Sequence, residues 1–266
     1  MPILELTALT RRFGEVLAVD SLTLSVEPGE VFGLLGPNGA GKSTTIKMLT
    51  TLLPPTSGTA RIADCEIGHQ AGLVRRLIGY VPQLLSADGT LNGYENLLIF
   101  AKLYDIPSGE RETRIDDALD FMGLSDAADT MVRNYSRGMI RRLEIAQSML
   151  HHPRVLFLDE PTVGLDPSAR HAVWELLQQL RTDFGTTIFL TTHLMEEADS
   201  LCRRVAIMHR GKMVALGTPR ELKNALQKPD ATLDDVFMHF AGDSLASGGG
   251  GYRDTAHSRR TSRRLG

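Results

Sequence analysis

The pattern of apolar and polar positions changes several times along this chain. Within residues 3–35, stretches such as Leu22-Thr23-Leu24-Ser25-Val26 alternate with a period of two, which predicts antiparallel strands. Further on, Val155-Leu156-Phe157-Leu158 is apolar at every position, as in a strand that is buried on both faces of a parallel sheet. The pattern therefore predicts two kinds of β-structure.

The middle of the chain favours helices instead. From about residue 84 to about residue 150 good strand patterns are lacking, and segments such as Tyr94–Ala101 and Arg114–Phe121 have helical spacing. Strand and helix alternate again from about residue 153, with a helix around Leu176–Leu180 and strands near 186–191 and 204–217. We therefore expect an α/β fold into which a helical segment is inserted.

The C-terminal part differs in composition. Residues 232–240 predict a short amphipathic helix with Thr232 as its cap. A glycine-rich stretch, Ser247-Gly248-Gly249-Gly250-Gly251, then leads to Arg259-Arg260-Thr261-Ser262-Arg263-Arg264. We expect one domain over residues 1–240 and a flexible basic tail over residues 241–266, which is either solvated or attracted to anionic lipid head groups.

Composition narrows the class of protein. At 266 residues the chain can build one sizeable core with a subdomain, and its net charge of −3 gives no sign of nucleic-acid binding. No apolar stretch approaches the roughly 18 residues that span a bilayer, and the first residues lack the basic start of a signal peptide. Cys65 and Cys202 are expected to be reduced, buried thiols. These features predict a cytosolic enzyme.

Residues 36–43 match the phosphate-binding pattern G-x-x-x-x-G-K-[ST] between an apolar strand and a predicted helix. Glycines let backbone N–H groups close on an anion, and the helix N-terminus adds partial positive charge. Lys42 is placed to reach the β- and γ-phosphates, and the Ser43 hydroxyl to bind Mg²⁺. The predicted nucleotide-binding residues are Gly36, Pro37, Asn38, Gly39, Ala40, Gly41, Lys42, Ser43 and Thr44. This loop predicts a nucleoside triphosphate as ligand.

Two adjacent acids, Asp159 and Glu160, follow the apolar run at 155–158. The carboxyl ends of strands in open α/β sheets are where ligands bind. Asp159 suits the role of holding Mg²⁺, directly or through water, and Glu160 that of a general base for the attacking water. Alternatively, the Asp-Glu-Pro sequence merely ends a strand and caps a turn.

The segment between these motifs indicates the family. Residues 134–146 contain Tyr-Ser-Arg-Gly-Met followed by arginines, which resembles the L-S-G-G-Q signature of ATP-binding cassette (ABC) ATPases. Gln83, Asp166 within Gly-Leu-Asp-Pro, and His193 after a β-branched strand resemble the family's Q-loop, D-loop and switch histidine, in the family's order. The resemblance covers roughly residues 3–240. The segment Tyr-Ser-Arg-Gly-Met followed by arginines resembles the branch of the family that includes daunorubicin-resistance and nodulation exporters.

The resemblance implies a fold and a set of roles. The fold would be a P-loop NTPase of ABC type, with a mixed or parallel core sheet, an antiparallel β subdomain and an α-helical subdomain at about 84–150. Glu160 and His193 would be catalytic, and Ser43, Gln83 and Asp159 would hold Mg²⁺. Phe13 would stack on adenine, although an isolated aromatic is usually a core residue. Asp166 would contact the partner subunit, cap a helix, or do both.

The signature departs from the family pattern at two positions. Arg137 replaces the first glycine and Met139 replaces the glutamine, whereas Ser136 and Gly138 are retained. In the family this segment approaches the γ-phosphate held by the opposite subunit, so Ser136, Arg137, Gly138 and Met139 are expected to act in trans. Arg137 either faces solvent or a partner, which we favour, or adds a charge-assisted bond to phosphate.

The resemblance also implies the biological role. The chain would bind ATP and Mg²⁺, work as a homodimer or heterodimer, and join a separate integral-membrane permease at the cytoplasmic face of the cell membrane. Efflux of a hydrophobic or drug-like substrate would follow, with the cargo determined by the permease. The alternatives are another type of transporter ATPase, a soluble ABC protein without transport, and a non-catalytic ATP-binding regulator suggested by Arg137. Duplicated cassettes or a long coiled-coil insertion, usual in the soluble proteins, are lacking.

Overall fold

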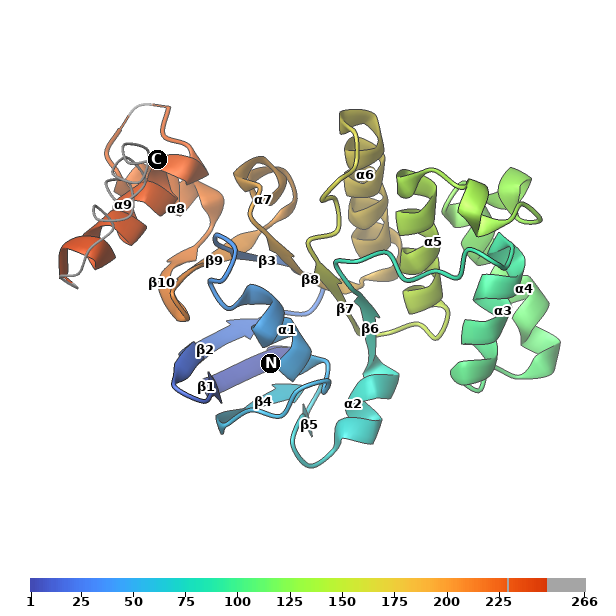
Figure 1. The fold of residues 1–266 in the computed structure, drawn as a ribbon, viewed down its shortest axis with the longest axis horizontal. Helices are drawn as coiled ribbons and strands as arrows, with labels where there is room; N and C mark the ends of the chain where they lie inside the picture. The colour runs from blue at the N-terminus through green and yellow to red at the C-terminus, as the bar shows by residue number, and fades with distance from the viewer. Residues whose placement is uncertain (229, 248–266) are drawn as a thin grey trace, which may run out of the picture.

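Two β-sheets form the centre of the molecule in a computed structural model that describes residues 1–228 and 230–247 (Figure 1). The antiparallel sheet has the order β2-β1-β4-β5 and comprises β1 (Leu4–Phe13), β2 (Val16–Val26), β4 (Ser57–Ile62) and β5 (Cys65–Glu66). The second sheet has the order β10-β9-β3-β8-β7-β6 and comprises β3 (Val31–Leu35), β6 (Ile78–Val81), β7 (Val155–Asp159), β8 (Thr187–Thr192), β9 (Arg204–His209) and β10 (Lys212–Gly217). Its strands pair in parallel except β9 with β10. Both predicted kinds of β-structure are present.

The strands of the second sheet place their side chains alternately in two hydrophobic cores. On one face, Leu156, Leu158 and Ile188 join a core that they share with helices α5 (Arg137–Met149) and α6 (Pro167–Phe184). On the other face, Phe157 and Phe189 join a core shared with the antiparallel sheet and helix α1 (Lys42–Leu49), and their ring centroids lie 5.5 Å apart. Burial on both faces explains why β7 is apolar at every position before its last residue, Asp159.

Helices cover both sheets and extend beyond them. They are α1 (Lys42–Leu49), α2 (Ala71–Leu77), α3 (Gly93–Leu103), α4 (Ser108–Phe121), α5 (Arg137–Met149), α6 (Pro167–Phe184), α7 (Met195–Leu201), α8 (Pro219–Ala225) and α9 (Leu233–Ser247). Figure 1 shows α3 and α4 at one end of the molecule and α8 and α9 at the other, with the sheets between.

The helical insertion consists of α3, α4 and α5, with short 3-10 turns at Ser125–Ala127 and Val132–Asn134. Helix α3 begins with a capping box in which Asn92 and Glu95 bond each other's backbone N–H groups. Helix α5 begins at Arg137 because the Ser136 hydroxyl accepts a hydrogen bond from Met139 N at 3.2 Å. The structure therefore confirms the predicted fold class, an α/β protein with mixed and antiparallel sheets and inserted helices.

The C-terminal helix is longer than expected. Thr232 Oγ1 accepts a hydrogen bond from Asp235 N at 3.2 Å, and an Asp235 carboxylate oxygen accepts one from Thr232 N at 2.9 Å. The helix that follows this cap continues to Ser247, past the expected domain boundary at residue 240. Residues 248–266, most of the predicted tail, lie outside the described residues. None of the described helices has the length and apolar character needed to cross a membrane.

One cysteine differs from expectation. Cys202 is buried as predicted, and burial raises the pKa of its thiol. The prediction that Cys65 is also buried was wrong, because Cys65 is half-buried. It lies in β5, a strand of two residues at the edge of the antiparallel sheet, where only one side pairs with another strand.

Candidate nucleotide-binding site

The loop between β3 and α1 requires glycine at two positions. Gly36 has φ of 153°, and a Cβ there would lie 2.4 Å from Met208 O. Gly41 has φ of 107°, and a Cβ there would lie 2.5 Å from Ala18 O. Both side-chain positions are filled by neighbouring backbone, so only glycine allows this loop. The loop delivers the first-turn N–H groups of α1, which have no partner inside the helix, to one anion-binding site.

Lys42, the first residue of α1, turns its ammonium group into this loop. Its side chain is only 4% exposed. The Nζ atom donates to Gly36 O at 2.7 Å and to Pro37 O at 3.2 Å, and forms an ion pair with Glu160 Oε1 at 3.2 Å. The ammonium is thus held where the loop closes. A phosphate chain in the loop would compete with Glu160 for it.

Asp159, the last residue of β7, is joined to the loop through a hydroxyl. Ser43 Oγ donates to Asp159 Oδ1 at 3.1 Å, and Thr191 Oγ1 of β8 donates to the same oxygen at 2.6 Å. The strand register pairs Asp159 with Thr191 directly. These contacts bring a hydroxyl and a carboxylate, ligands suited to Mg²⁺, to one point at the carboxyl end of the sheet.

Glu160 lies at the meeting point of several elements. Its backbone N–H donates to the carbonyl oxygen and to the hydroxyl of Thr191, both at 3.1 Å, which holds the residue at φ of 50°. Its Oε2 accepts from Gln83 Nε2 at 3.2 Å and lies 3.0 Å from His193 Nδ1. The bond to a carboxylate places the imidazole proton on Nδ1. A buried carboxylate is therefore held between a lysine, an amide and a histidine.

A cavity of about 550 Å³ opens above these groups. It is lined by Phe13, Ala18, Asn38, Gly39, Gly41, Lys42, Ser43, Thr44, Gln83 and Glu160. Phe13 is 46% exposed at its rim, and the guanidinium of Arg11 lies 4.6 Å from the Phe13 ring centroid. Three predicted loop residues, Gly36, Pro37 and Ala40, shape the loop instead of lining the cavity. Residues from four distant motifs thus surround one space.

The signature residues lie elsewhere. Ser136 and Arg137 are exposed at the start of α5, and Arg137 Nη1 donates to Gly164 O of the predicted D-loop at 3.4 Å. A Cβ on Gly138 would lie 2.9 Å from Ala169 Cβ, so glycine allows α5 to approach α6. Among the described residues that line the cavity, none comes from residues 136–139. Within one copy of the chain, the predicted signature therefore lies outside the cavity that the predicted nucleotide-binding residues line.

Asp166 is the N-cap of α6, one of the two roles expected for it. Its side chain caps α6, because Oδ1 accepts a hydrogen bond from Ala169 N at 3.0 Å. Pro167 follows as the first residue of the helix.

Comparison with known proteins decides the family. The family described as ABC transporter matches residues 19–163. Over 223 residues the chain is 45% identical to the daunorubicin/doxorubicin resistance ATP-binding protein DrrA of Streptomyces peucetius, a match covering 84% of this chain and 67% of that protein. This chain belongs to the ABC transporter family. It is also 43% identical over 220 residues to the Nod factor export ATP-binding protein I of Cupriavidus metallidurans, covering 83% of this chain and 72% of that protein.

The fold of this ABC protein agrees with a solved relative. CbiO1 of Clostridium perfringens, described as part of the ABC transporter complex CbiONQ, matches with a TM-score of 0.77 at 27% identity. The match covers 92% of this chain and 96% of that structure. Membership of this family makes the chain an ATP-binding protein that hydrolyses ATP in connection with transport.

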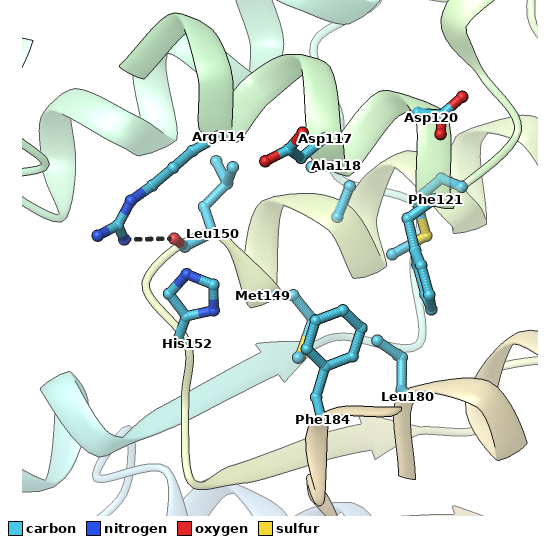
Figure 2. A pocket seen from close by; sticks show the side chains of 12 residues that line it. Arg114, Asp117, Ala118, Asp120, Phe121, Met149, Leu150, His152, Leu180 and Phe184 are labelled. Carbon is cyan, nitrogen blue, oxygen red and sulfur yellow. Dashed lines mark hydrogen bonds between the residues drawn. The ribbon is translucent and has the colours of Figure 1, made fainter. Parts of the chain in front are cut away.

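A second cavity, of about 380 Å³, lies between α4, α5 and α6 (Figure 2). Phe121 of α4 and Phe184 of α6 both line it and make an edge-to-face ring contact with centroids 5.2 Å apart, and Arg114 donates to Leu150 O at 3.2 Å. It shares no lining residue with the cavity at Lys42. The residues that the sequence predicts to bind phosphate surround the other cavity.

Sequence reasoning missed Thr191, which bonds both Asp159 and Glu160. The available signal was a threonine at the buried end of a strand, because a buried hydroxyl requires a partner. Identifying that partner required knowing that β7 and β8 are neighbours, which the motifs alone do not state.

Proposed function

We propose that this chain is the ATP-hydrolysing subunit of an ABC exporter, which works as a dimer with a separate membrane permease to drive efflux of a hydrophobic or drug-like substrate. The names of its relatives support export, since one is named for daunorubicin/doxorubicin resistance and another for Nod factor export. The proposal of a dimer rests on one observation. The signature lies at the exposed start of α5, apart from the cavity proposed to bind nucleotide. A second copy can supply the missing residues.

The residues around the cavity suit hydrolysis. Lys42 neutralises charge on the β- and γ-phosphates, and its engagement with phosphate releases Glu160 from their ion pair. Glu160 then accepts a proton from the attacking water, while Gln83 and His193 hold its carboxylate in place. Phe13, exposed at the rim, offers a flat apolar face to adenine.

The same site fits Mg²⁺. The Ser43 hydroxyl and the Asp159 carboxylate lie 3.1 Å apart, and the Gln83 amide lines the same cavity. All three supply oxygen ligands of the kind that Mg²⁺ prefers. When bound, the ion neutralises phosphate charge. The signature segment, residues 136–139, would face the opposite subunit. Ser136 and Gly138 would approach the γ-phosphate that the opposite subunit holds, whereas Arg137 would face solvent or the partner.

Exposed apolar side chains support a permease as partner. Leu84 and Leu85 directly follow Gln83, and Ile99 and Leu103 lie one turn apart on α3. Contiguous exposed apolar patches mark interaction sites, and a partner that covers both segments would bury these side chains. A permease docked here would contact the segment that reaches Glu160, which would couple transport to hydrolysis.

Purification from native membranes tests this proposal. A tagged chain should bring down a multi-span membrane protein from detergent extracts, and Leu84→Ser with Leu103→Ser should weaken the association while leaving ATP binding intact. A chain that purifies without a membrane protein, and that hydrolyses ATP at the same rate with and without the membrane extract, would favour a soluble ABC protein.

Cells that depend on this transporter should accumulate an amphiphilic dye when Lys42→Ala replaces the wild type. Unchanged accumulation would contradict export of such a substrate.

A further inference from the structure

Arg141 is an unusually buried cation. It lies in α5, two residues after the signature segment 136–139, and its exposed fraction is 1%. Its Nη1 donates to Pro82 O at 2.7 Å and its Nη2 donates to Gln83 O at 2.8 Å. The planar guanidinium therefore donates hydrogen bonds to two successive carbonyl groups of the segment that contains Gln83.

Glu144, one turn further along the same helix, holds the other end of that segment. Its Oε1 accepts a hydrogen bond from Ser86 Oγ at 3.1 Å and another from Ser86 N. Its Oε2 forms an ion pair with Arg141 Nη1 at 3.0 Å, and both side chains are almost fully buried. Burial raises the pKa of Glu144 and lowers that of Arg141, as expected for charges removed from water. Such a pair contributes little stability compared with apolar packing, so positioning is the better explanation for it.

Gln83 connects this pair to the catalytic carboxylate. Its backbone carbonyl is held by Arg141, and its side-chain amide donates to Glu160 Oε2 at 3.2 Å. The signature residue Ser136 caps the helix that carries Arg141 and Glu144. One rigid helix thus begins at the signature and holds, from its middle, the residue that contacts Glu160.

We propose that Arg141 and Glu144 are positioning residues that fix the Gln83 amide against Glu160. Movement of α5, the helix that begins at the signature, would then change the position of this amide relative to the general base. This inference rests on the proposed roles of Gln83 and Glu160. It adds a path within one subunit from the signature to the catalytic carboxylate.

A double-mutant cycle tests whether Arg141 acts through Gln83. Arg141→Lys keeps the charge but not the planar fork that reaches both carbonyls. We expect it to lower kcat roughly tenfold with little change in ATP affinity, as for an interaction realised in the transition state. In a Gln83→Ala background the same change should alter kcat by less than about twofold, because the amide that Arg141 positions is gone.

Arg142→Lys is the matched control. Arg142 is the next residue on the same helix and donates to Met122 O at 2.7 Å and Gly123 O at 3.3 Å, which lie after α4 and not near Gln83. It should lower kcat by no more than about twofold in either background. Glu144→Gln, which keeps an acceptor for Ser86 but loses the charge facing Arg141, should show the same dependence on Gln83 and serves if Arg141→Lys fails to fold.

Equal effects of Arg141→Lys in both backgrounds, or an effect no larger than that of Arg142→Lys, would overturn the inference. A general loss of stability would lower kcat by the same factor in both backgrounds, so it cannot imitate the expected result. Failure of the proposed function is recognised separately, because Glu160→Gln would then hydrolyse ATP at the wild-type rate.

Discussion

Ser43 Oγ donates a hydrogen bond to Asp159 Oδ1 at 3.1 Å, although 116 positions separate the two residues in the chain. The contact joins the start of α1 to the end of β7, and Thr191 of β8 bonds the same carboxylate oxygen. The phosphate-binding loop and the acidic pair are therefore parts of one site. A substitution in either motif is expected to affect the other.

Lys42→Ala should abolish ATP binding at ordinary nucleotide concentrations, because it removes the ammonium that serves the β- and γ-phosphates. Calorimetric titration of the purified variant with Mg-ATP measures this. Lys47→Ala is the control, since Lys47 lies on the same helix but is exposed. An affinity of Lys42→Ala equal to that of the wild type would count against the assignment of the loop.

Arg137→Gly restores the residue that is usual in the family signature. Arg137 is exposed and contacts Gly164 O, so we expect turnover to stay within a few-fold of the wild type. If Arg137 instead bonds phosphate across the dimer, the change removes a bond of about 1.5–3 kcal/mol. That corresponds to a loss of roughly 10- to 150-fold in rate.

Steady-state phosphate release distinguishes these outcomes for Arg137. Ser136→Arg is the companion variant, because a bulky cation at the helix cap should block closure under either account. A large loss in Arg137→Gly with intact ATP binding would make Arg137 a residue that acts in trans.

Stability should fall in mild acid partly because of His151. Its ring stacks on Tyr104 with centroids 3.7 Å apart, its Nε2 donates to Ile78 O at 2.9 Å, and burial lowers its pKa below the ordinary 6.5. Between the lowered pKa and about 6.5 the unfolded chain binds more protons than the folded one, so stability is lost as pH falls through this window.

Thermal unfolding at about pH 7.5 and about pH 5.5 measures this loss. The midpoint of the wild type should fall further between the two pH values than that of His151→Gln, whose amide can still donate to Ile78 O but does not titrate. Equal falls in the two proteins would show that His151 makes no contribution.

Parts of the site could be predicted because their residues are close in sequence. Residues 36–44 and the pair Asp159–Glu160 each follow an apolar strand, and strand ends of one parallel sheet meet at one edge. Gln83 and His193 also follow strands, but a single glutamine or histidine there forms no motif of its own, so the family resemblance was needed to select them.

Other features depend on which elements become neighbours. Thr191 bonds Asp159 because β8 pairs with β7 in that register. Arg141 and Glu144 read as ordinary charged positions of a helix, yet packing of α5 against the segment after β6 buries them. Half-burial of Cys65 likewise follows from its place in an edge strand, which an apolar surrounding sequence does not reveal.

The variant Glu160→Gln tests whether Glu160 is the general base of an ATP-closed dimer. The change keeps shape and hydrogen-bonding capacity but removes the basic carboxylate, so phosphate release should fall by about 10² or more while ATP still binds. The variant should also elute as a dimer in Mg-ATP and as a monomer without nucleotide. Turnover near that of the wild type, with no nucleotide-dependent dimer, would contradict the account and make His193 the first candidate for the base.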